Sequence, residues 1–278
     1  MKKVVLTVFF LVLALAIFVF PAQSFNPAAH VYIADHKFPN HPYKNDLYYG
    51  SIAPDMAMYT NEAKWPNSFW DTHHTYINLI PFAQGTRQLA FARGWFTHNE
   101  ENQADRIAHG NYLIGYGDGY VTVKANLLWE QMILFLGLTA PYDESYLYFA
   151  HFAIEAAIDL LLKEQYDHSI GIKLLLANLF RSPLDRELLT RVLKNETDWI
   201  TLLITELTFR NLVNQYATAL SSPKPFDALV KLGVQLAQQQ FGITATPELL
   251  SWVLDEAINL CAGDYYHSAI LPAVNGMP

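Results

Sequence analysis

Residues 149–159, which read FAHFAIEAAID, decide how the rest of this sequence is interpreted. His151, Glu155 and Asp159 follow one another at intervals of four, so they project from one face of a helix, one turn apart. All other residues of the stretch are apolar, as in a helix of a protein core. A buried imidazole and a buried carboxylate need each other or a metal ion. The stretch therefore predicts either a hydrogen-bonded pair or metal ligands at His151 and Glu155.

Histidines are concentrated in the part of the chain that precedes this stretch. Eight of the ten lie between His30 and His151. Six of these histidines and three carboxylates fall in short segments: 26–30 (NPAAH), 53–55 (APD), 72–74 (THH), 94–98 (GWFTH), 104–109 (ADRIAH) and 151–155 (HFAIE). Imidazole and carboxylate are the ligands that Zn²⁺ takes when no thiolate is offered. We therefore expect these segments to converge on one metal-binding pocket.

A single helix is expected over residues 86–109, because apolar residues recur there at helical spacing. At roughly 100° per residue, metal-competent or polar side chains fall within about 100° of arc on one side of it. They are His98, Glu101, Asn102, Asp105 and His109. A solvated face with ion pairs is the alternative interpretation, but this face contains no lysine. The pattern favours metal ligands.

The chain as a whole is predicted to be all-α, a multi-helix bundle with a loop-rich N-terminal segment and additional C-terminal helices. No period-two strand pattern persists for more than a few residues. A short helix is expected at 30–33, followed by loops with several prolines up to Pro66. Ser182-Pro183 and Thr246-Pro247 are start signals that put a proline at the first helical position. The remaining helices are expected at 121–137, 143–163, 196–220, 226–240 and 248–260.

The N-terminus has the pattern of a secretory signal peptide. Two lysines precede an apolar run of 17 residues at 4–20, and Ala22 and Ser24 are small residues before a cut at Phe25. Residues 1–24 are therefore predicted to be removed on export, to the periplasm or the medium. An uncleaved membrane anchor is the alternative, although the run is shorter than the ~20 residues of a bilayer span.

Charge and length bound the function of the exported part. About 254 residues remain after the cut, and we expect them to form a single domain, 25–278. The formal net charge is −8 for the whole chain. Binding to a nucleic-acid backbone needs clustered lysine and arginine, so no nucleic-acid partner is expected.

Taken in their order, these motifs resemble the zinc-dependent phospholipase C family, all-helical secreted bacterial enzymes. The resemblance covers residues 25–160, whereas the extra helices in 161–278 match nothing that we can name. It implies a helical bundle with two or three zinc ions, in which a zinc-activated water attacks the phosphodiester of a phospholipid. The protein would then contact a membrane peripherally.

The resemblance also implies which residues bind the metal. The ligands carried over are Phe25 (through its backbone amine and carbonyl), His30, Asp55, His73, His98, Asp105, His109, His151 and Glu155. Asp55 is in addition the candidate general base. His74 is an alternative to His73, because the doubled histidine leaves the register open.

The central helix departs from the family's pattern. The family has an aspartate that bridges two metals four residues after the first histidine, and here that position holds Asn102. Alternatively Asp105 is the bridge and Glu101, four residues before it, replaces the histidine, which leaves His98 beside the site. We choose Asp105 as the bridge. Glu101, Asn102 and Asp159 are then alternative ligands or residues that orient one.

Three classes of function follow from this interpretation. The first is a zinc-dependent phosphodiesterase that acts on phospholipid head groups. The second is a related trinuclear zinc nuclease or phosphatase, which the acidic net charge disfavours in its nuclease form. The third is a non-catalytic exported protein that retains the metal-binding scaffold, which Asn102 keeps open.

Overall fold

A computed structural model describes residues 26–74, 77–98, 104–110, 118–137, 145–241 and 244–276. These residues form helices joined by short connections and contain no strand, so the all-α prediction is confirmed. The elements are α2 (Pro27–Lys37), α3 (Lys44–Ile52), η1 (Ala53–Tyr59), η2 (Trp70–His74), η3 (Ile80–Phe82), α4 (Gly85–His98), α5 (Ala104–His109), α6 (Tyr120–Leu136), α7 (Ser145–Gln165), α8 (Ile170–Phe180), α9 (Leu184–Val192), α10 (Trp199–Ser221), α11 (Pro225–Phe241), α12 (Pro247–Cys261), η5 (Tyr266–Ile270) and α13 (Leu271–Asn275).

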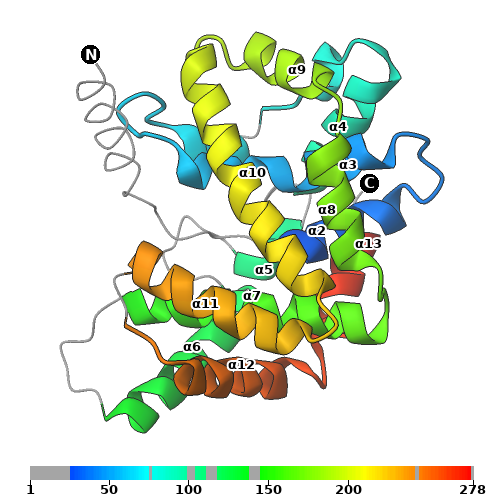
Figure 1. Ribbon diagram of the computed structural model, residues 1–278. Coiled ribbons are helices and arrows are strands. Elements are labelled where there is room, and N and C mark those ends of the chain that lie inside the picture. Colours follow the sequence, from blue (N-terminus) through cyan, green and yellow to red (C-terminus); the bar gives the residue numbers. More distant parts are fainter. Residues whose placement is uncertain are drawn as a thin grey trace.

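Helices α2 and α5 lie in the middle of the molecule (Figure 1). Above them in this view α8 and α10 run side by side, with α9 at their upper end, and below them α7, α11 and α12 form a second group. Helix α2 contacts α3, α4, α7 and α8. The helix that carries His30 is therefore surrounded by other helices.

Helices α3 and α4 cross in direct backbone contact at two glycines. A Cβ added to Gly50 would collide with the carbonyl of Phe91, and one added to Gly94 would collide with the carbonyl of Leu47. Only glycine permits so close an approach of two backbones. This crossing brings the end of α4 against the end of α3, where His98 lies.

The start signals are borne out to within one residue. Thr246 is the N-cap of α12, and its hydroxyl accepts a hydrogen bond from the backbone N–H of Leu249 at 3.2 Å, with Pro247 first in the helix. Helix α9 begins one residue later than expected, with Pro183 as its N-cap.

Two expectations about the N-terminal half need correction. The helix expected at 30–33 is the longer α2, and α3 lies within the stretch that was expected to be loop-rich. The seven residues from Asp46 to Ile52 are all buried, so α3 has no polar stripe to reveal it. Of the helix expected over 86–109, the structure describes α4 and α5, while residues 99–103 lie outside the described part.

The N-terminal predictions fall on residues 1–25, which also lie outside the described part. The signal peptide at 1–24 and a backbone ligand at Phe25 therefore stay predictions. Among the helices that are described, none combines the length and hydropathy needed to cross a bilayer.

Candidate metal centre

Six segments bring eight predicted ligands together in two groups. The first group is His30 from α2, Asp55 from η1, His73 from η2 and His98 from the end of α4. The second group is Asp105 and His109 from α5 with His151 and Glu155 from α7. Seven of the eight side chains are buried, and that of His151 is 12% exposed.

The first group is built around the carboxylate of Asp55. Its Oδ1 lies 3.3 Å from Nε2 of His98 and 3.4 Å from Nε2 of His73. The two Nε2 atoms are 3.3 Å apart. The ring of His30 stacks on that of His98, with centroids 4.0 Å apart. One ligand atom each of His30, Asp55 and His98 lies within 4.8 Å of the other two, close enough to share one ion.

The orientation of His98 is set by the backbone of α3. Nδ1 of His98 donates a hydrogen bond to the carbonyl oxygen of Ser51 at 2.8 Å, because a carbonyl oxygen can only accept. In the neutral ring Nε2 then has a lone pair, and it faces the carboxylate of Asp55. Two acceptors in contact require a positive species between them, either a proton or a metal ion.

The orientation of the His73 ring is set by Thr72, its neighbour in the sequence. The hydroxyl of Thr72 donates to the carbonyl oxygen of Ser68 at 2.9 Å, so it accepts the hydrogen bond from Nδ1 of His73 at 2.7 Å. The Nε2 lone pair of His73 therefore also faces the group. An acceptor on the far ring nitrogen is typical of metal-binding histidines.

The second group repeats this arrangement. Nδ1 of His109 donates to Oδ1 of Asp105 at 2.8 Å, and its Nε2 lies 3.0 Å from Nε2 of His151. Oε1 of Glu155 lies 3.0 Å from Nε2 of His151 and 3.6 Å from Nε2 of His109. Two imidazole nitrogens and one carboxylate oxygen thus converge in a buried space.

Asp105 links the two groups. Its Oδ1 holds His109, whereas its Oδ2 is buried without a hydrogen-bond partner among the described residues. A buried carboxylate oxygen without a hydrogen bond costs folding free energy unless a cation binds it. Burial disfavours the charge of Asp105, but the surrounding imidazoles, His109 first among them, outweigh it and lower the pKa of Asp105. Its negative charge in turn favours the protonated forms of His30 and His98 in the first group.

The pKa values within the groups are pushed apart. Burial disfavours ionisation of Asp55, yet His98, His73 and His30 together hold its pKa below the usual range. Burial also disfavours the charged form of His98, but Asp55 outweighs it and raises the pKa of this ring. Burial lowers the pKa of His30 well below its usual value.

The second group shows the same division. Burial lowers the pKa of His151 to about 4 and raises that of Glu155 to about 8. For His109 the carboxylate of Asp105 outweighs burial and raises the pKa. The raised pKa values favour protons on His98, His109 and Glu155, at places that a dication would take.

Asp159 lies outside both groups and caps α2. Its Oδ1 accepts a hydrogen bond from the backbone N–H of Ala29 at 2.7 Å, and its Oδ2 accepts from that of Ala28 at 3.1 Å and from the hydroxyl of Tyr216 at 2.9 Å. A carboxylate at a helix N-terminus satisfies free N–H groups and opposes the helix dipole. Asp159 thus fixes the helix that carries His30.

Two residues that orient the histidines, Ser51 and Thr72, were not predicted from the sequence. Ser51 contributes only a backbone carbonyl, which no side-chain pattern reveals, whereas Thr72 stands directly before His73 and could have been noted. Glu101 and Asn102 lie outside the described residues, and of His74 the side chain is not described. The choices between His98 and Glu101 as ligand, and between Asp105 and Asn102 as bridge, therefore stay predictions.

Comparison with known proteins gives two partial similarities. No family model matches the chain, and no solved structure matches it. A protein of Archaeoglobus fulgidus described as uncharacterized is 34% identical over 141 residues, which cover 45% of this chain and 38% of that protein. A second uncharacterized protein of that organism is 37% identical over 96 residues, which cover 28% of this chain and 29% of that protein. The matched part is thus well under half of either relative.

Proposed function

We propose that this protein is a zinc-dependent phosphodiesterase that hydrolyses phospholipid head groups. The observation that carries the proposal is the orientation of His73, His98 and His109. In each ring an acceptor holds Nδ1, so that the Nε2 lone pair is directed toward a carboxylate. A protein built only for stability has no need to direct buried acceptors at one another, whereas a metal centre requires it.

The donor set fits zinc. Four imidazole or carboxylate side chains, His30, Asp55, His73 and His98, would hold one ion, and His109, His151 and Glu155 would hold a second. Asp105, whose Oδ2 has no hydrogen-bond partner among the described residues, would bridge toward the first ion. Zinc accepts this mixture of nitrogen and oxygen ligands. Bound there, it would neutralise phosphate charge and lower the pKa of the attacking water.

Asp55 would act first as an anionic ligand. Its lowered pKa keeps it ionised at any working pH of the enzyme. A general base works best when its pKa lies near that pH, so the second role predicted for Asp55 would be the weaker one. The burial of the group would exclude bulk water, which strengthens every charge interaction within it.

A lipid rather than a nucleic acid is the substrate that these features support. The ordered motifs in residues 25–160 resemble phospholipases, and the formal net charge of −8 disfavours a polyanionic partner. An exported enzyme with a buried centre would meet phospholipid at a membrane surface and contact it peripherally.

The test is hydrolysis by the protein that begins at Phe25. Release of the phosphorylated head group from phosphatidylcholine and phosphatidylethanolamine is measured before chelation, after chelation, and after zinc is restored. We expect activity that a chelator removes and zinc restores, and that Asp55→Asn abolishes. His267→Gln, at an exposed histidine outside both groups, serves as the control and should keep full activity.

Two results would contradict the proposal. Hydrolysis that is unchanged by chelation would exclude a role of the metal. Zinc-dependent cleavage of an oligonucleotide or of a phosphomonoester, without hydrolysis of phospholipid, would show that the protein is instead a nuclease or a phosphatase.

A further inference from the structure

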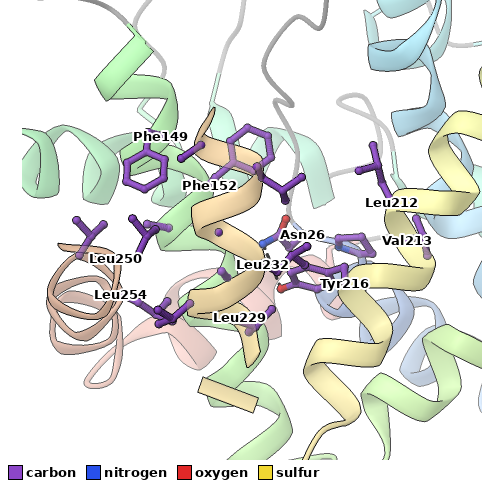
Figure 2. A pocket seen from close by; sticks show the side chains of 18 of the residues that line it. Asn26, Phe149, Phe152, Leu212, Val213, Tyr216, Leu229, Leu232, Leu250 and Leu254 are labelled. Carbon is purple, nitrogen blue, oxygen red and sulfur yellow. Dashed lines mark hydrogen bonds between the residues drawn. The ribbon is translucent and has the colours of Figure 1, made fainter. Parts of the chain in front are cut away.

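A cavity of about 140 Å³ lies between α7, α10, α11 and α12, beside the start of α2. Its lining is apolar except for Asn26, Tyr59 and Tyr216. Figure 2 shows leucines of α11 and α12, with Phe149 and Phe152 of α7, around this space. The residues come largely from the C-terminal helices, which the resemblance to phospholipases does not cover.

The size and lining of the cavity fit a small apolar group. An engineered cavity of about 150 Å³ lined by leucine, isoleucine and phenylalanine stays dry and binds benzene. The cavity here is nearly as large and similarly lined, so it has room for about six carbon atoms. Water would find few hydrogen-bond partners in it.

The cavity and the metal groups share three segments of the chain. In α7, Phe152 and Ala156 line the cavity, while their neighbours His151 and Glu155 belong to the second group. Asn26 and Pro27 line it four and three residues before His30. Tyr59 lines it at the end of η1, the element that carries Asp55.

The three polar residues that line the cavity are each linked to the metal groups or to the helix of His30. Nδ2 of Asn26 donates to the hydroxyl of Tyr216 at 3.2 Å, and this hydroxyl donates to Asp159, which caps the helix of His30 (Figure 2 shows Asn26 and Tyr216). Burial and the charges of Asp55 and Glu155 raise the pKa of Tyr59, so its hydroxyl is within electrostatic reach of both groups. A ligand in the cavity therefore has an apolar end among the leucines and a polar end toward the centre.

We propose that this cavity binds about six carbons of one aliphatic chain of an amphiphile. The chain is held among α7, α10, α11 and α12, and the polar end of the molecule is presented to the metal groups. That this amphiphile is the substrate rests on the proposed function, whereas binding of the chain itself does not. The protein would then select its ligand by the tail as well as by the head group.

The first test measures binding of uncharged alcohols to the purified protein, without chelation, by calorimetry. Each buried methylene tightens binding about fourfold, so hexan-1-ol should bind about 16-fold more tightly than butan-1-ol. Ala237 is a buried lining residue, and Ala237→Leu fills the cavity. We expect this substitution to weaken the binding of hexan-1-ol at least tenfold.

Matched variants keep this test decisive. Gln239→Leu adds a leucine at an exposed position of the same helix and should leave hexan-1-ol binding unchanged. Ala237→Val adds less volume, so that a folded variant is available if the leucine is not tolerated, and should give a smaller loss. Equal affinity for the two alcohols, or equal hexan-1-ol affinity in wild type and both Ala237 variants, would overturn the proposal.

The second test uses hydrolysis and separates this proposal from the proposed function. Ala237→Leu should raise KM for dihexanoylphosphatidylcholine about tenfold and leave kcat unchanged, while Gln239→Leu changes neither. If hexan-1-ol binds as expected but no phospholipid is hydrolysed, the chain site stands and the proposed function fails. If hydrolysis occurs with the same KM in the Ala237 variants, the chain site fails and the proposed function stands.

Discussion

Oγ1 of Thr72 lies 2.7 Å from Nδ1 of His73 and accepts a hydrogen bond from it. The hydroxyl has only one proton of its own, and it donates that proton to the carbonyl of Ser68. Thr72 therefore determines which nitrogen of His73 faces Asp55. The ring is held in the tautomer that a metal requires.

Thr72→Val should weaken zinc binding by about 10- to 100-fold, the loss typical when the partner of a metal-binding histidine is removed. Valine keeps the shape and removes the acceptor, so that Nδ1 of His73 is left buried without a partner. Thr72→Ser restores a hydroxyl and should bind nearly as well as wild type. Competition titration with a chromophoric chelator measures the three affinities. Equal affinity in the valine variant would contradict the role of Thr72 in orienting His73.

Asp105→Asn should release at least one zinc per chain and abolish hydrolysis. A bridge between two dications needs two charged oxygens, and asparagine offers one neutral oxygen. Elemental analysis of each purified variant measures the loss, with circular dichroism to check that the helices are intact. Asn102→Ala should reduce zinc content and hydrolysis far less.

The reverse pattern would contradict the choice of bridge. If Asp105→Asn keeps wild-type zinc and turnover while Asn102→Ala does not, the bridge stands four residues after His98. Glu101→Gln refines the result, because a large loss assigns Glu101 as a ligand and a small one leaves that role to His98.

Zinc affinity should rise with pH between about 6 and 9. The pKa values of His98 and His109 are raised because Asp55 and Asp105 outweigh burial, and burial raises that of Glu155 to about 8. The protonated forms of these three groups cannot bind metal, so binding must release their protons. Affinity is therefore highest above these pKa values and falls as the pH drops through them.

Each displaced proton makes the affinity change about tenfold per pH unit. Competition titrations at pH 6, 7 and 8, corrected for protonation of the chelator, measure this slope. His151, whose pKa burial lowers to about 4, does not contribute to it. An affinity independent of pH would mean that protons do not occupy the ligand positions in the metal-free protein.

The fold was predictable where the sequence repeats with a helical period. Helices α6, α7, α10, α11 and α12 begin and end within three residues of the expected positions. Helix α3 was not predictable, because it is buried on all sides and its sequence has no polar stripe. The crossing of α3 and α4 was not predictable either. Nothing in the sequence shows that Gly50 and Gly94 lie where the two backbones come into contact.

The candidate site was predictable as a set of residue types but not as a geometry. Helical spacing singled out His109 and Glu155, the resemblance to the phospholipase family added His30 and Asp55, and the structure brings these residues into two groups. The division into two groups, and the cap that Asp159 forms on α2, depend on how distant segments pack. The carbonyl of Ser51 and the cavity beside α7 were invisible, because one is backbone and the other is a space between helices.

The most direct test of a metal centre is the zinc content of the protein that begins at Phe25, measured together with its thermal midpoint before and after chelation. Zinc that joins α2, η1, η2, α4, α5 and α7 would bind only the folded chain, so it would stabilise the fold by mass action, by about 2.7 kcal/mol when free zinc is 100-fold above Kd. We predict two or three zinc ions per chain and a midpoint that falls by several degrees on chelation. Zinc below one ion per chain, with a midpoint that a strong chelator leaves unchanged, would contradict the account.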